Sequence, residues 1–153
     1  MKFETDYAAL SQDLDALVSG VPYLTANLAN TSALLWQMLP GLNWAGFYQL
    51  LEGENALVLG PFQGKPACIR IPMGRGVCGT AAAEGRTVRV ENVHDFPGHI
   101  ACDGASNSEI VIPLYRQGKL WGVLDLDSPY LGRFAPEDQA GLEEIAKKIE
   151  SFL

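Results

Sequence analysis

The sequence predicts an α+β domain with a central antiparallel sheet of six strands and with its N- and C-terminal helices packed on one face. Two observations lead to this fold class. Apolar residues recur at helical spacing near both ends of the chain, and the segments between them are short and rich in β-favouring residues. Most of these short segments are joined by hairpin turns, which make neighbouring strands antiparallel. The length of 153 residues predicts a single domain over 1–153.

Two amphipathic helices are expected before the sheet. Apolar residues recur every three or four positions over 7–18, and Gly20 marks the end of this helix. A second series runs over 24–39 and stops at Pro40 and Gly41, because proline cannot continue a helix and glycine favours its C-terminal cap.

The sheet is expected to begin at residue 43, where the apolar spacing changes. Residues 43–51 and 56–62 flank the turn sequence 52–55 (EGEN), which predicts a hairpin, and 68–71 predicts a third short strand.

The second half of the chain repeats this alternation. The alanine-rich segment 78–84 predicts a short helix that ends at Gly85. Further strands are expected over 87–90, 109–115 and 119–127, the last two as a hairpin. A last helix begins at Pro136, with Glu137 and Asp138 at the positive end of its dipole.

Composition and charge exclude several classes of partner. Eleven basic residues against eighteen acidic ones give a formal charge of −7, the wrong sign for binding nucleic acid or an anionic membrane. The first ten residues contain no apolar run of a signal peptide, and no stretch reaches the roughly 20 apolar residues of a membrane span. Three cysteines are too few for a disulfide scaffold, which favours a reducing compartment. We therefore expect a cytoplasmic protein.

The cysteines and histidines do not predict a metal site. Cys68, Cys78 and Cys102 show no zinc-type spacing, and His94 and His99 are typical of surface or hydrogen-bonded loop residues. Cys68 and Cys78 fit either buried apolar packing or redox chemistry. Cys102 predicts a reactive thiol, because it lies in the aperiodic segment 91–108, and a polar loop of this length is usually functional or disordered.

Three acidic residues form a second candidate site. Asp125 and Asp127 are two positions apart in a predicted strand, so both side chains point to one face, and Glu109 begins the strand beside it. They converge in a pocket, or they are solvated acids at a strand end; the spacing alone leaves both open. The segment 74–77 (GRGV) is likewise either a tight turn or an anion cradle before a helix.

Three motifs resemble the free methionine-(R)-sulfoxide reductases, single-domain members of the GAF superfamily. They are 76–82 (GVCGTAA), 97–103 (PGHIACD) and 106–114 (SNSEIVIPL). The resemblance covers essentially the whole chain, and all three cysteines fall at the family's positions. It implies a GAF fold and reduction of free L-methionine (R)-sulfoxide to methionine. It also implies regeneration by thioredoxin, ultimately from NADPH, without a bound cofactor.

The resemblance also implies roles for residues. Cys102 would be the nucleophile that becomes a sulfenic acid, Cys68 would resolve it by forming a disulfide during turnover, and Cys78 would be an auxiliary thiol. The substrate-binding residues implied are Glu109, Asp125 and Asp127 for the sulfoxide and amino groups, and Trp44 and Tyr48 near the methyl end. A carboxylic acid beside the sulfoxide suits the reaction, because the departing oxygen must gain protons. Backbone N–H groups, with 74–77 as candidates, would take the substrate carboxylate.

Two other classes use the same features. A GAF sensory module would bind a small ligand such as a cyclic nucleotide or a tetrapyrrole, although the acids would repel a phosphate. A thiol redox sensor would use the cysteines without a substrate. The family resemblance also predicts a homodimer, with the first two helices as its contact surface.

Overall fold

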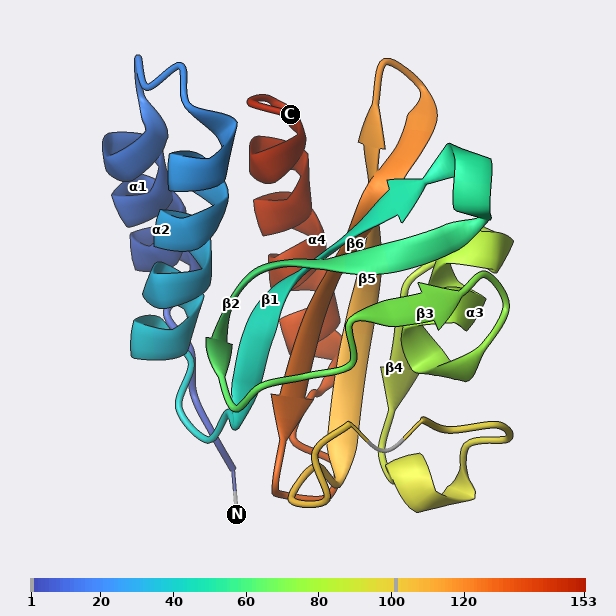
Figure 1. Ribbon diagram of the computed structural model, residues 1–153. Coiled ribbons are helices and arrows are strands. Elements are labelled where there is room, and N and C mark those ends of the chain that lie inside the picture. The colour runs from blue at the N-terminus through green and yellow to red at the C-terminus, as the bar shows by residue number, and fades with distance from the viewer. Residues whose placement is uncertain (1, 101) are drawn as a thin grey trace.

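The computed structural model describes residues 2–100 and 102–153. Its six-stranded antiparallel sheet has three helices on one face and one short helix on the other (Figure 1). The helices are α1 (Tyr7–Val18), α2 (Leu24–Met38), α3 (Gly76–Glu84) and α4 (Pro136–Glu150). The strands are β1 (Trp44–Leu51), β2 (Ala56–Gly64), β3 (Arg70–Pro72), β4 (Val88–Val90), β5 (Ser108–Arg116) and β6 (Lys119–Ser128). The predicted fold class and element order are confirmed; Met1 and Ala101 lie outside the described residues.

The prediction for the third strand is wrong at its start. The segment 68–71 was expected to be extended, but β3 begins at Arg70 and pairs with Ala56, Leu57 and Val58. The carbonyl of Cys68 instead accepts a hydrogen bond from the Tyr48 hydroxyl at 2.9 Å, so it is not free for the ladder. Cys68 therefore lies in the connection before the strand.

Sheet order places distant parts of the sequence side by side. The order is β3-β2-β1-β6-β5-β4, with β1 and β6 at the centre. Their register puts Trp44 opposite Asp127 and Gly46 opposite Asp125. Strand alternation then sends Trp44, Asp125 and Asp127 to one face of the sheet and their neighbours to the other.

The two faces are covered differently. Helices α1, α2 and α4 bury an aliphatic core that includes Leu10, Leu35 and Leu126, each fully buried. Full burial of one such side chain stabilises the fold by about 1.5–3 kcal/mol. The other face, under α3, has a smaller core of aromatic and small residues such as Trp44, Tyr48 and Cys78. No helix among the described residues has the length and apolarity to span a membrane.

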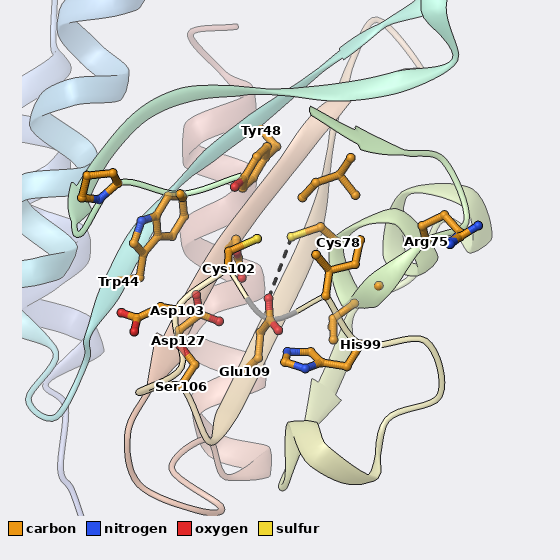
Figure 2. A pocket seen from close by; sticks show the side chains of 17 residues that line it. Trp44, Tyr48, Arg75, Cys78, His99, Cys102, Asp103, Ser106, Glu109 and Asp127 are labelled. Carbon is orange, nitrogen blue, oxygen red and sulfur yellow. Dashed lines mark hydrogen bonds between the residues drawn. The ribbon is translucent and has the colours of Figure 1, made fainter. Parts of the chain in front are cut away.

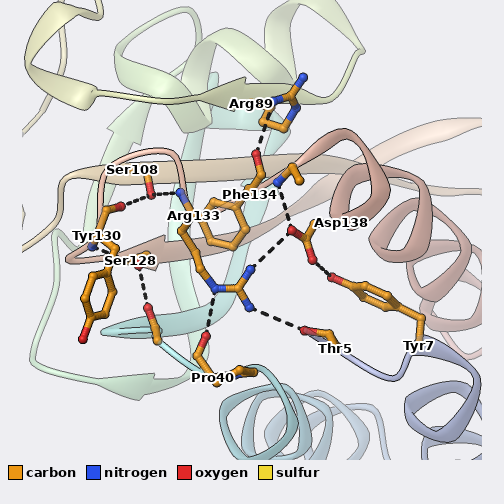
Figure 3. Close-up of polar contacts among 12 residues, drawn as sticks. Thr5, Tyr7, Pro40, Arg89, Ser108, Ser128, Tyr130, Arg133, Phe134 and Asp138 are labelled. Atoms are coloured by element: carbon orange, nitrogen blue, oxygen red, sulfur yellow. Dashed lines mark hydrogen bonds and ion pairs between the residues drawn. The ribbon is translucent and has the colours of Figure 1, made fainter. Parts of the chain in front are cut away.

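A buried ion pair joins the chain ends behind the sheet. The guanidinium of Arg133 lies 3.3 Å from the Asp138 carboxylate and donates to the carbonyl of Pro40 at 2.8 Å (Figure 3). Asp138 also accepts from the Tyr7 hydroxyl at 2.6 Å and from the backbone N–H of Ala135 at 2.9 Å. The acid that was expected only to suit the helix dipole therefore caps α4 and anchors α1 to it.

Two serines secure the strand ends that carry the predicted acids. The Ser108 hydroxyl donates to the Tyr130 carbonyl at 2.6 Å, and the Ser128 hydroxyl donates to the carbonyl of Gly41 (Figure 3). Ser108 and Ser128 pair across β5 and β6, next to the paired Glu109 and Asp127. The serines point to the helix-covered face and the acids to the opposite face, so the helix side holds the ends of both strands in place.

Candidate active site

A cavity opens on the face of the sheet under α3. Its walls come from β1, β5, β6, the start of α3 and the loop segments around 66–67 and 99–106 (Figure 2). Every side chain implied by the resemblance lines this cavity except Cys68: Trp44, Tyr48, Cys78, Cys102, Glu109, Asp125 and Asp127. The cavity volume is about 40 Å³, enough for roughly three ordered waters.

The three predicted acids converge, as one of the two interpretations expected. Glu109 lies directly opposite Asp127 in the β5–β6 register, and Asp125 lies opposite Val111 on the same face. Glu109 is 7% exposed and Asp125 is 5% exposed. The alternative of solvated acids at a strand end is therefore wrong for these two side chains.

Burial and mutual repulsion determine which acids keep their protons. Burial, then the charges of Asp125 and Asp127, raise the pKa of Glu109 well above its usual range. Burial, then the charge of Asp125, raise the pKa of Asp127 in the same way. Burial also raises the pKa of Asp125, but hydrogen bonds from Glu109 and Cys78 oppose the rise. Because hydrogen bonds to a carboxylate favour its charged form, Asp125 carries the negative charge best, and Glu109 and Asp127 retain protons.

Cys78 is part of the acid cluster and not of a redox pair. Its sulfur lies 3.9 Å from Oε2 of Glu109, and the thiol is free and buried (Figure 2). Burial, then the charges of Asp125 and Glu109, raise the pKa of this thiol well above its ordinary value. Cys78 is therefore a protonated, poorly nucleophilic thiol in this structure.

The other two cysteines form a disulfide. Cys68 and Cys102 are bonded, with their Cα atoms 5.5 Å apart and a sequence separation of 34 positions. This is the pairing that the resemblance implied. It links the connection before β3 to the loop before β5 and places Cys102 over the cavity.

Two aromatic side chains make the apolar wall. The rings of Trp44 and Tyr48 stack with centroids 5.8 Å apart, and both polar ends are occupied. The Trp44 indole N–H donates to the Lys65 carbonyl at 3.1 Å, and the Tyr48 hydroxyl donates to Cys68. Gly46 lies between them on the same face, where an added Cβ would clash with Cβ of Phe62. The wall is consequently fixed and apolar, and it suits a methyl or thioether group.

The residues at the start of α3 line one side of the cavity. Arg75, Gly76, Val77 and Cys78 all line it, and the first N–H groups of a helix have no partner within that helix. Gly76 adopts φ +63°, which favours glycine. The Arg75 side chain points away from the acids in Figure 2, so its guanidinium does not contact them.

Sequence reasoning missed four residues around the cavity. Asp103, Ser106 and His99 line it, and the Asn43 amide donates to Asp103 at 3.1 Å and to Ser106 at 3.0 Å. A hydrogen bond from the Ala105 N–H lowers the pKa of Asp103, so this acid is ionised. Burial, then the charge of His94, lower the pKa of His99. The position of Asp103 directly after Cys102 was the one available signal; the others depend on loop conformation.

The cluster also has the donor types of a metal site. One ligand atom each from Cys78, Glu109 and Asp125 lie within 4.8 Å of one another. A cation would compete there with the protons that these groups hold. His94 hydrogen-bonds to Asn107 at 2.9 Å, as expected for a loop histidine.

Comparison with known proteins places this site in a family. The GAF domain model matches residues 3–153. The chain is 57% identical over 147 residues to the free methionine-R-sulfoxide reductase of Escherichia coli, covering 96% of this chain and 88% of that protein. The fold thus occurs in a known class of domain. The chain belongs to the GAF domain family and, within it, to the group of the free methionine-R-sulfoxide reductases.

Two solved structures support the same placement. The structure of fRMsr of Staphylococcus aureus in complex with substrate is 48% identical, with a TM-score of 0.93 over 100% of this chain and 99% of that one. The free methionine-R-sulfoxide reductase from Neisseria meningitidis, also in complex with its substrate, is 44% identical, with a TM-score of 0.93 over 99% and 93% of the two chains.

Proposed function

We propose that this chain reduces free L-methionine (R)-sulfoxide to L-methionine. The observation that carries the proposal is a pair of redox-linked cysteines beside a buried group of acids that retain protons. The similarity to reductases of this name supports the substrate. The apolar wall of Trp44 and Tyr48 suits the methyl end of such a molecule.

Different acids of the cluster suit different polar groups of the substrate. A sulfoxide oxygen accepts hydrogen bonds, so it suits the protonated carboxyls of Glu109 and Asp127. An ammonium group donates, so it suits Asp125, whose Oδ1 is buried and lacks a hydrogen-bond partner among the described residues. The substrate carboxylate would then reach the N–H groups at the start of α3, where the helix dipole favours an anion.

The chemical steps balance with two thiols. The sulfur of Cys102 attacks the sulfoxide sulfur while Glu109 or Asp127 protonates the departing oxygen. The oxygen is transferred, leaving methionine and a sulfenic acid on Cys102. The thiol of Cys68 then displaces water from that sulfenic acid and forms the disulfide. Thioredoxin, drawing on NADPH, restores both thiols, and the cycle needs no bound cofactor.

The size of the cavity supports a change of loop position during the cycle. With the disulfide formed, the cavity volume is about 40 Å³. This volume holds roughly three waters and is too small for a whole amino acid. We infer that the loop bearing Cys102 moves away from Cys68 when the disulfide is reduced.

We also propose that the protein acts in the cytoplasm as a homodimer.

A coupled assay tests the function. Purified protein is combined with thioredoxin, thioredoxin reductase, NADPH and free methionine sulfoxide of resolved configuration. We expect NADPH consumption with the R epimer. Peptide-bound sulfoxide should be a poor substrate, because a site that binds both the amino and the carboxylate group has no room for a continuing chain. Absence of NADPH consumption with the free R epimer would overturn the proposal and favour a sensory module or a thiol redox sensor.

A further inference from the structure

Ile69 is an unusually exposed apolar residue at an informative position. Its side chain is 73% exposed, and it directly follows Cys68 of the disulfide. The exposure is not fraying, because the Ile69 carbonyl accepts from the Leu59 N–H and the Cys68 carbonyl accepts from the Tyr48 hydroxyl, both at 2.9 Å. Single exposed apolar residues are ordinary. This one is held in place beside a sulfur that must be reached from outside.

The sequence segment that contains Cys68 has a charge opposite in sign to that of the whole chain. The chain has a formal charge of −7, yet the segment 55–83 contains three basic residues and no acidic one: Lys65, Arg70 and Arg75. Glu54 neutralises part of this charge, since it lies 3.4 Å from Arg70. Lys65 is in no ion pair within the ranges 2–100 and 102–153. An acidic partner is attracted here and repelled by most of the remaining surface.

The two sulfurs of the disulfide differ in what an incoming thiolate would meet. Cys102 lines the cavity together with Asp103 and Asp125, the two acids that carry negative charge, so an incoming thiolate is repelled there. Cys68 is absent from the cavity lining and lies between Lys65 and Arg70 in sequence. Attack on Cys68 also releases the Cys102 sulfur beside carboxyls that hold protons, which makes Cys102 the better leaving group.

We propose that Ile69, with Lys65 and Arg70 as its basic rim, is the docking surface for the protein that reduces the disulfide. The partner is a dithiol oxidoreductase whose attacking thiol lies in an apolar surface with acidic residues around it. This inference rests on the proposed function in one respect: it takes the Cys68–Cys102 disulfide to be the oxidised end of the catalytic cycle.

The exchange balances in two steps. The partner's thiolate forms a bond to the Cys68 sulfur, and the Cys68–Cys102 bond breaks, so Cys102 leaves and takes a proton from the acid cluster. The partner's second thiol then attacks the mixed disulfide and releases Cys68. Two electrons pass from the partner, which is left as a disulfide, and both cysteines of this chain are thiols again.

A trapping experiment identifies the attacked sulfur. The oxidised full chain is mixed with a thioredoxin that retains only its attacking cysteine, and the mixed disulfide is located by peptide mass spectrometry. We expect thioredoxin on Cys68. Thioredoxin on Cys102 would overturn the proposal. No sulfoxide is present, so the result does not depend on whether the chain reduces methionine sulfoxide.

A kinetic experiment tests the surface. We expect Ile69→Asp to slow reduction of the disulfide by intact thioredoxin about tenfold, the loss typical of a central apolar contact, and to leave the rate with dithiothreitol unchanged. Tyr23→Asp is the matched control, because Tyr23 is 69% exposed, lies in the connection between α1 and α2, and is absent from the cavity lining. Equal thioredoxin rates in wild type and Ile69→Asp, or equal slowing with both reductants, would contradict the docking surface.

Discussion

Two buried polar clusters lie on opposite faces of the same sheet and differ in how their charges are balanced. Behind the sheet, Arg133 and Asp138 form an ion pair that is completed by Tyr7, a carbonyl and a backbone N–H. In front of it, Glu109, Asp125 and Cys78 lie together, and neither acid forms an ion pair with a basic side chain within residues 2–100 and 102–153. The first arrangement satisfies its groups and joins the chain ends. The second leaves Oδ1 of Asp125 without a hydrogen-bond partner in the part of the chain that the structure describes.

The difference indicates what each cluster is for. A buried charge without a partner costs several kcal/mol, and proteins avoid that cost by keeping the group protonated. The front cluster therefore keeps protons next to a disulfide, as the proposed removal of the sulfoxide oxygen requires. The rear cluster is an ion pair that stabilises the fold and supplies no proton to a reaction.

The largest expected effect is on activity, from a change in the front cluster. Glu109→Gln keeps the shape of the side chain and removes its acidic proton, so kcat for the sulfoxide should fall about 10²–10⁴-fold, the usual contribution of a general acid. Folding stability should be unchanged or higher, because one member of a repelling group is lost. Steady-state kinetics and urea unfolding of the same preparation measure both. If Glu109→Gln were destabilised and fully active, Glu109 would have a structural role like that of the rear cluster, which would contradict its role as a general acid.

A change in the rear cluster should give the opposite result. Arg133→Met leaves Asp138 buried without its cation, and loss of one partner of a buried pair costs about 3–5 kcal/mol of unfolding free energy. The folded fraction should keep its kcat. Lys147→Met is the control, because Lys147 and Glu144 form an exposed pair of the kind worth about 1 kcal/mol or less. Urea unfolding that gives equal stabilities for the two variants would contradict a structural role for Arg133.

The smallest expected effect is a change in how stability depends on pH. A carboxyl whose pKa is raised by folding binds its proton more tightly in the native state, so its contribution falls as pH rises from the unfolded value toward the folded one. Glu109 is such a group. The stability of Glu109→Gln relative to wild type should therefore increase from pH 4.5 to pH 8 in urea unfolding.

Asp103→Asn provides the matched control with the opposite sign. The pKa of Asp103 is lowered, so its carboxylate stabilises the fold at neutral pH and this stabilisation is lost as pH falls. Relative to wild type, Asp103→Asn should be least stable at neutral pH. If the stability of both variants relative to wild type changed in the same direction with pH, the opposite pKa shifts assigned to Glu109 and Asp103 would be contradicted.

Local patterns were sufficient to predict most of the fold. The period-two spacing of Asp125 and Asp127 and the turn before β6 placed three acids on one face, and β5–β6 pairing has that register. The start of β3 was wrong because Tyr48, 20 residues away, takes the carbonyl of Cys68. Propensity cannot report such a contact, since it forms only when β1 is in place.

The remaining features depend on contacts between distant segments. The sequence did not predict that Arg133 and Asp138 would be buried with Tyr7, which is 131 positions from Asp138. The Asn43 bonds to Asp103 and Ser106 span about sixty residues between a strand start and an aperiodic loop. Side chains of these types are usually solvated, so their roles appear only when the fold brings their partners together.

Single-turnover chemistry tests the central claim that Cys102 is the nucleophile and Cys68 the resolving thiol. Fully reduced enzyme is mixed with excess free methionine (R)-sulfoxide without any reductant, and the methionine formed is counted by chromatography. Wild type and Cys68→Ser should each give about one methionine per chain, ending as the disulfide and as a sulfenic acid respectively. Cys102→Ser should give none. A full equivalent of methionine from Cys102→Ser would contradict the account.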